Sequence, residues 1–136
     1  MKKDKHRIIG IDFDGTLAIS KGTYPRITGE NTEIIEYIKE EQSKGAYLIL
    51  ITMRENRELE QAVDWCNARG IFFDAINDNL GFMKEFFHNN PRKIFCTEYI
   101  DDTNFGGINY ILKEIKRKKE KIQWYFVLVQ FAGVAI

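Results

Sequence analysis

The sequence predicts an α/β fold, a doubly wound three-layer sandwich with a mainly parallel central sheet. Short β-branched or continuously apolar runs alternate along the chain with segments whose apolar residues recur at helical spacing. Strands that alternate with helices are typical of βαβ units, in which helices cover a parallel sheet. The length of 136 residues is that of one domain, and no internal repeat interrupts the alternation.

Four runs have the character of strands. Residues 8–11 form a short run in which three of the four residues are β-branched isoleucines, and residues 46–52 form a continuous apolar run that ends in a threonine. Such a continuous run is expected of a parallel strand that is buried on both faces. The other two predicted strands are residues 71–76 and 98–100.

Four segments have the character of helices. In the first, Ile34, Ile35 and Ile38 recur at helical spacing after Asn31 or Thr32, either of which can serve as the N-cap. A glycine closes each of the first two segments, as is common at helix ends. The predicted helices are residues 31–44, 55–70, 82–88 and 106–118.

Composition and charge exclude several classes of protein. Hydrophobic residues make up 44% of the chain and charged residues 29%, so we expect a globular rather than a disordered protein. The formal net charge is zero, which gives no electrostatic signal for nucleic acid. The basic and apolar start of the chain is too short in its apolar part for a signal peptide. Cys66 and Cys96 form neither a CxxC pair nor a metal-binding spacing, so we expect buried thiols in the cytoplasm.

Polar residues follow three of the predicted strands. Asp12 and Asp14 come after the first, Thr52 ends the second, and Asp101 and Asp102 end the fourth. Ligands of doubly wound sheets bind at the carboxyl ends of the strands, so we expect these side chains to converge there. The structural alternatives are a solvated turn after the first strand, a simple strand end and a helix N-cap formed by the last two acids.

The acids of the first loop have the arrangement needed for phosphoryl transfer. The Asp12 carboxylate can attack phosphorus, and Asp14 can protonate the leaving oxygen and later activate water. Gly15 permits a tight turn, and the amides from Phe13 to Gly15 can bind phosphate oxygens. This arrangement predicts Asp12 and Asp14 as catalytic residues and Phe13 and Gly15 as substrate-binding residues.

An attacking carboxylate and a phosphate repel each other, so the site needs a cation. Carboxylate oxygens are ligands suited to Mg²⁺, which we expect as the cofactor. The candidate metal ligands are Asp12, Asp14, Asp101 and Asp102.

Two further side chains are expected to bind the transferring phosphoryl group. Thr52 offers a hydroxyl, and a lysine would balance the charge of the phosphoryl oxygens. Lys93 is the best candidate because it lies eight residues before Asp101, and Lys84 is the alternative. Lysine is common on surfaces, so an ordinary solvated side chain is the competing interpretation for both.

These residues carry a resemblance to a known family. The string "DFDGTL" at 12–17, the threonine at 52, a lysine and "DD" at 101–102 resemble motifs one to four of the haloacid dehalogenase (HAD) superfamily. "TYPRI" at 23–27 and "IDDTNFGGI" at 100–108 are similar to a small group of bacterial and phage HAD hydrolases. The resemblance implies a HAD-like Rossmannoid fold, with Asp12 as nucleophile and Asp14 as general acid and base. It also implies that Thr52 and Lys93 bind the phosphoryl group, and that Asp101 ligates Mg²⁺ with Asp102 beside it.

The resemblance also implies an open site. HAD enzymes usually carry a cap domain, whereas here only 14 residues separate Leu17 from Thr32, so we expect no large cap domain. Arg54, Tyr24 and Arg26 are candidates for a substrate-binding rim, because arginine suits anionic groups. An ordinary solvated loop is an equally good interpretation of these three residues.

The expected function is that of a Mg²⁺-dependent phosphomonoester hydrolase (phosphatase) that forms an aspartyl-phosphate intermediate. The expected substrate is a small phosphate ester such as a nucleotide or sugar phosphate. The alternatives are a phospho-acceptor regulatory domain, a catalytically silent phosphate-binding domain and a polynucleotide end phosphatase. The regulatory domain fits less well. Receiver domains place their acid pair after the first strand and their acceptor aspartate after the third, whereas here the Asp-x-Asp string at 12–14 follows the first strand and the Asp-Asp pair at 101–102 follows the last.

The end of the chain has a different character. We expect a HAD-like catalytic domain over residues 1–121 and a hydrophobic tail over residues 122–136, which forms an added strand or an interface segment. The tail is shorter than the roughly 20 residues needed to span a bilayer, so a membrane is the less expected partner and a homo-oligomer contact the more expected one. The basic run at 116–121 is expected to be a solvated helix end.

Overall fold

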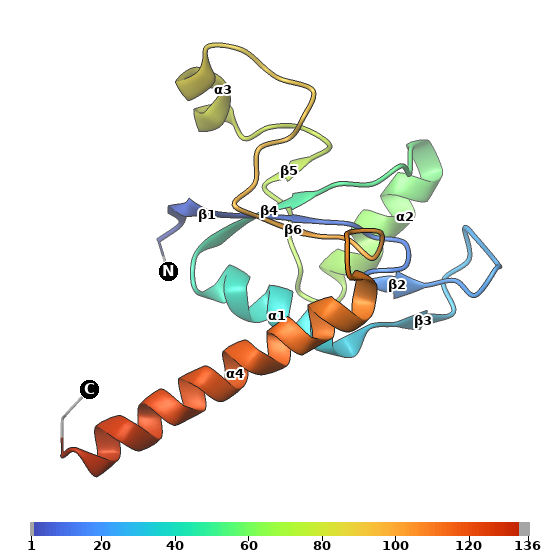
Figure 1. Ribbon diagram of the computed structural model, residues 1–136. Coiled ribbons are helices and arrows are strands. Elements are labelled where there is room, and N and C mark those ends of the chain that lie inside the picture. The colour runs from blue at the N-terminus through green and yellow to red at the C-terminus, as the bar shows by residue number, and fades with distance from the viewer. Residues whose placement is uncertain (1, 134–136) are drawn as a thin grey trace.

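The computed structural model describes residues 2–133 and has the predicted α/β architecture (Figure 1). Within these residues the central sheet has four strands in the order β5-β4-β1-β6, and every pair of neighbours is parallel. The strands are β1 (Asp4–Ile11), β4 (Ala46–Leu50), β5 (Ala75–Ile76) and β6 (Glu98–Ile100).

Helices cover both faces of this sheet and so form a Rossmann-like three-layer sandwich. Two hydrophobic core clusters lie between the sheet and these helices. One contains apolar residues of α1, α2 and α4, and the other contains residues at the start of α3 and in the loop before β6. Figure 1 shows α3 on one side of the sheet and α1 and α4 on the other. The helices are α1 (Thr32–Ser43), α2 (Asn56–Asn67), α3 (Gly81–Phe87) and α4 (Gly107–Phe131).

The strand order creates a switch point beside β1. The chain first moves outward from β1 to β4 and β5, and then crosses back to place β6 on the other side of β1. In doubly wound sheets a crevice for ligands opens where the order reverses, outside the carboxyl ends of the strands. Ile11 pairs with Ile100 at the last position of both strands, so Asp12 and Asp101 leave the sheet side by side.

A small hairpin that the sequence patterns did not predict follows β1. Strands β2 (Ala18–Ile19) and β3 (Gly29–Glu30) pair antiparallel, and they hold the only regular structure described between Leu17 and Thr32. Two-residue strands are too short to show a periodic pattern. The expectation that no large cap domain is inserted here therefore agrees with the described residues.

Two predicted strands were too long at their ends because side chains replace backbone pairing there. The strand predicted over residues 71–76 is limited to β5, since the Asp74 carboxylate accepts the hydrogen bond of the Leu48 amide at 2.9 Å. The strand predicted to reach Thr52 ends at Leu50, and the Thr52 amide donates instead to Asn77 Oδ1 at 2.8 Å.

The prediction of an added strand in the tail was wrong. Helix α4 continues without interruption from Gly107 to Phe131, across the expected boundary at residue 121, and the basic run at 116–121 lies in its middle. Apolar runs of this length do not distinguish strand from helix, and no glycine or proline lies between Gly107 and Gly133 to stop the helix. Residues 134–136 of the predicted tail lie outside the described residues. None of the helices described has the length and apolar character that crossing a bilayer requires.

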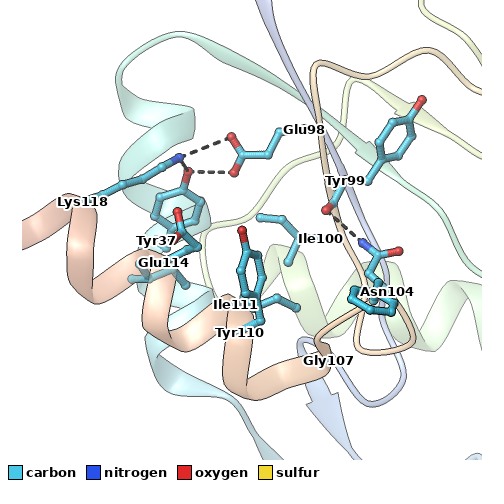
Figure 2. A pocket seen from close by; sticks show the side chains of 12 residues that line it. Tyr37, Glu98, Tyr99, Ile100, Asn104, Gly107, Tyr110, Ile111, Glu114 and Lys118 are labelled. Atoms are coloured by element: carbon cyan, nitrogen blue, oxygen red, sulfur yellow. Dashed lines mark hydrogen bonds and ion pairs between the residues drawn. The ribbon is translucent and has the colours of Figure 1, made fainter.

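The first half of α4 is fastened to the body of the protein by a polar cluster (Figure 2). The Tyr37 hydroxyl of α1 donates to Glu98 of β6 at 2.8 Å, and Lys118 of α4 donates to the Tyr37 oxygen at 2.8 Å. Lys118 also forms an ion pair with Glu98 at 3.6 Å. These bonds join a helix, an edge strand and a second helix at one wall of a pocket of about 490 Å³.

The two cysteines are buried and form no disulfide with each other. Burial raises the pKa of each thiol to about 12. We therefore expect neither Cys66 nor Cys96 to react with a thiol reagent such as DTNB in the native state, and both to react once the chain is unfolded. Rapid modification of either thiol in the folded protein would contradict the described packing.

Candidate active site

Three carboxylates meet at the switch point of the sheet. Asp12 follows β1 directly, and its amide donates to the Ile100 carbonyl at 2.9 Å, which ties the loop to β6. Asp101 and Asp102 follow β6. One carboxylate oxygen from each of these aspartates lies within 4.8 Å of the other two. The predicted convergence of these acids is thus confirmed, and we call the group Asp12, Asp101 and Asp102 the acidic triad.

Thr16 joins two members of the triad, a role that the sequence analysis missed. Its buried hydroxyl contacts Asp12 Oδ2 at 2.9 Å and Asp102 Oδ1 at 3.2 Å, and accepts the Asp102 amide at 2.9 Å. The signal was the threonine that follows the "DFDG" string. Gly15 is required beside it, because its φ is +84° and a Cβ there would collide with the Asp102 carboxylate.

The triad is electrostatically strained without a cation. Burial, contact with the Asp102 carboxyl and the nearby charges of Asp101 and Asp102 raise the pKa of Asp12 to about 7, although the Thr16 hydroxyl acts in the opposite direction. Three hard oxygen donors so close together are the chemistry that a divalent cation such as Mg²⁺ takes. The residues present therefore fit a metal ion.

This shift gives a pH-dependent prediction for the metal-free protein. Because the pKa of Asp12 rises from 3.8 to about 7 on folding, the folded state holds a proton that the unfolded state releases, and stability falls as the pH rises across that interval. We expect Asp12→Asn to raise the free energy of unfolding in EDTA at neutral pH by about 1–2 kcal/mol, after allowance for partial exposure. This gain in the free energy of unfolding should become smaller as the pH falls from about 7 toward 3.8.

Thermal melts over this pH range, with and without Mg²⁺, test the prediction. Mg²⁺ should stabilise the wild type and have little effect on Asp12→Asn. Asp64→Asn, which removes an exposed carboxylate on α2, is the matched control and should show neither effect. A loss of stability in Asp12→Asn of the same size at every pH would contradict the account.

Asp14 does not belong to the triad, contrary to its prediction as a metal ligand. Arg54 holds it in a bidentate pair, in which Nε donates to Oδ2 and Nη2 to Oδ1, both at 2.8 Å. The two acids of the "DFD" string thus have different partners. Because strong pairing with an arginine competes with metal coordination, the acidic triad remains as the set of carboxylates that could hold a metal ion.

Arg54, a candidate for the substrate-binding rim, lines a cavity together with the triad acids, but its guanidinium is already engaged by groups of the protein. Its side chain is 1% exposed, and its guanidinium lies about 5 Å from both the Phe13 and the Tyr24 rings. All five N–H groups have acceptors, since Arg54 also donates to the carbonyls of Pro25 and Glu58 and to the side-chain oxygen of Gln61. Arg54 therefore positions Asp14 and the loop around it.

The remaining predicted residues of this region lie in different places. Thr52 and Tyr24 line a cavity of about 560 Å³, the triad cavity, together with Asp14 and all three triad acids. Phe13 has its side chain in the core, edge-on to Trp65, so only its backbone can face a ligand. Arg26 is exposed and is not among the residues that line the triad cavity.

The structure distinguishes between the two candidate lysines. Lys93 lines a second cavity of about 650 Å³, the cation cavity, whose wall also includes Asp12 and Asp101. Lys84 belongs to α3 and forms an ion pair with Asp78 at 2.7 Å. The cation cavity includes Arg92, which the sequence analysis missed although it directly precedes Lys93. Among residues 2–133, neither Arg92 nor Lys93 forms an ion pair.

The pocket between β6 and α4 shown in Figure 2 differs from these two cavities in the residues that line it. It contains no member of the acidic triad, and its carboxylates are already engaged, Glu98 by Lys118 and Glu114 by Arg117. The chemistry-bearing side chains therefore gather around Asp12, which borders both the triad cavity and the cation cavity.

Fold and site together define a Rossmann-like α/β protein with an acidic site at its switch point. A conserved protein from Bacteroides thetaiotaomicron has a similar solved structure, with a TM-score of 0.66 and 38% sequence identity over 82% of this chain and 90% of that chain. The chain belongs to the same family as that conserved protein. No protein-family model and no curated protein matches the sequence.

Proposed function

We propose that the chain is a Mg²⁺-dependent phosphomonoester hydrolase of the haloacid dehalogenase superfamily, with Asp12 as its nucleophile. The observation that carries the proposal is that two aspartates of one loop have different surroundings. Asp12 lies in the acidic triad, whereas Asp14, two residues later, is held by Arg54. Carboxylates with such different surroundings are suited to different roles in one reaction.

The first step is transfer of the phosphoryl group to the protein. The Asp12 carboxylate attacks phosphorus, the bond between phosphorus and the ester oxygen breaks, and the leaving oxygen takes a proton from Asp14. Thr16 orients the attacking group, since its hydroxyl contacts Asp12 Oδ2 at 2.9 Å. Thr52 and Lys93, which border the two cavities around Asp12, bind the phosphoryl oxygens.

The second step releases phosphate. Asp14, now ionised, takes a proton from water, and the water oxygen attacks phosphorus. The bond from phosphorus to Asp12 breaks, which yields inorganic phosphate and restores both carboxyl groups. Mg²⁺ held by the acidic triad would offset the negative charge of the carboxylates and of the phosphoryl group.

Arg54 sets the resting position of Asp14. Both oxygens of Asp14 accept hydrogen bonds from the guanidinium, so Asp14 must leave this pair and take up a proton from solvent before it can protonate a leaving group. The Asp14 side chain retains about a third of its exposure on the side that lines the triad cavity, which gives it room to move.

The substrate class in this proposal is a small phosphate ester, such as a nucleotide or a sugar phosphate, with negative charge beyond the transferring group. The support is the cation cavity, where Arg92 lies next to Lys93 at the wall that Asp12 shares. Two cations that have no carboxylate partner within residues 2–133 favour an anionic substrate. The cytoplasm, a reducing compartment, is part of the proposal, because both cysteines are unpaired.

A phosphatase assay tests the proposal. We expect the purified chain to release phosphate from p-nitrophenyl phosphate and from members of a nucleotide and sugar phosphate panel when Mg²⁺ is present. EDTA should stop the release, and added Mg²⁺ should restore it. No metal-dependent release from any substrate in the panel, or a stable phosphoprotein that never turns over, would contradict it.

A further inference from the structure

The second half of α4 exposes a run of large apolar side chains. We call residues 122–131 the distal α4 segment. Its side chains are among the most exposed hydrophobic groups of the described chain, with Trp124 at 66% and Phe131 at 92%. The others are Ile122, Tyr125, Phe126, Val127 and Leu128.

These side chains are distributed around the helix rather than along one stripe. Trp124, Tyr125 and Phe126 are consecutive, and successive residues of an α-helix are about 100° apart, so these three alone extend over more than half of the circumference. A helix packed on one neighbour buries a stripe of roughly 100°. Pairing with one helix of a second copy would therefore leave much of this surface in water, whereas a medium that surrounds the helix would cover it.

The turns that precede the distal α4 segment are strongly basic. Residues 113–121 contain six lysines or arginines and two glutamates. Lys116, Lys119 and Lys121 are exposed and form no ion pair within residues 2–133. A basic cluster directly beside Trp, Tyr and Phe side chains complements a bilayer surface that carries anionic lipid.

The fold holds this helix so that its distal part is free. Lys118 fixes the middle of α4 to Glu98 and Tyr37, and beyond that point the helix projects past the body of the sheet (Figure 1). Ten residues of helix are about 15 Å long, which matches roughly one half of a 30 Å hydrocarbon core.

We propose that the distal α4 segment inserts into one leaflet of a bilayer that contains anionic lipid, with the basic turns at residues 113–121 at the level of the headgroups. The acidic triad lies near the other end of α4, at the carboxyl ends of the strands, and stays open to water. This inference does not depend on the proposed phosphatase activity.

Vesicle binding by the full chain tests the proposal. We expect the protein to co-sediment with phosphatidylcholine vesicles that contain phosphatidylglycerol, and to bind pure phosphatidylcholine vesicles far more weakly. The triple variant Lys116→Gln, Lys119→Gln, Lys121→Gln should weaken binding about 100-fold, since each charge near an anionic surface is worth about 1 kcal/mol. Trp124→Ser with Phe126→Ser should abolish co-sedimentation, and in the wild type the fluorescence of Trp124 should shift to the blue on binding.

Matched controls separate this effect from general electrostatics. The triple variant Lys21→Gln, Lys39→Gln, Arg57→Gln removes the same charge from exposed positions outside α4 and should bind within twofold of the wild type. Failure to bind anionic vesicles would overturn the proposal. So would a stable dimer in light scattering that vesicles do not dissociate and that Trp124→Ser with Phe126→Ser converts to monomer, because a second copy would then cover the segment.

Discussion

Replacing Asp12 by asparagine is expected to lower kcat for a phosphate ester by a factor on the order of 10⁴ or more. The amide cannot form the covalent bond to phosphorus, and no other carboxylate of the first loop is free, since Asp14 is held by Arg54. Steady-state kinetics with p-nitrophenyl phosphate and saturating Mg²⁺ measure the effect.

The same variant should remain folded, which makes the loss of activity interpretable. Asparagine has nearly the shape of aspartate and removes one charge from the acidic triad, so Asp12→Asn should melt no lower than the wild type in EDTA. Asp64→Asn on α2 serves as the matched control and should retain full activity. Substantial turnover by a correctly folded Asp12→Asn would remove Asp12 as the nucleophile.

Replacing Arg54 by methionine is expected to cost about 3–5 kcal/mol of the free energy of unfolding. The change leaves Asp14 without its partner and deprives the carbonyls of Pro25 and Glu58 of a buried donor. Urea denaturation of the metal-free protein measures this cost. Arg54→Lys should recover only part of the loss, because an ammonium group cannot form the bidentate pair.

A second arginine provides the matched comparison. Arg57 is exposed at the start of α2 and forms no ion pair within residues 2–133, so Arg57→Met should change stability by no more than about 0.5 kcal/mol. If Arg54→Met were as mild as Arg57→Met, the buried network around Asp14 would not have the role assigned to it.

The elements that bury apolar residues could be predicted from the sequence. Ile34, Ile35 and Ile38 all lie in the core on α1, and the run from Ala46 to Leu50 forms a strand buried on both faces. These patterns are reliable because burial of one face imposes a fixed spacing on the chain. The convergence of Asp12, Asp101 and Asp102 followed from the same patterns, through the topology of a parallel sheet.

Pairings between distant side chains could not be predicted in the same way. Nothing local distinguishes Arg54 from an exposed arginine, because its partner Asp14 is 40 residues away and reaches it only after the sheet forms. Thr16 was missed for a related reason, since its contact with Asp102 joins loops 86 residues apart. The tail was assigned wrongly because a short apolar run is compatible with both a strand and a helix.

Chemical trapping at Asp12 tests the central claim most directly. The protein is mixed with substrate and Mg²⁺, quenched and reduced with borohydride, which converts an aspartyl phosphate to homoserine. Trypsin then releases residues 8–21 as one peptide that contains both Asp12 and Asp14, and fragmentation in the mass spectrometer locates the change. The account predicts homoserine at position 12, only when substrate is present. Homoserine at another aspartate, or none while phosphate is being released, would contradict it.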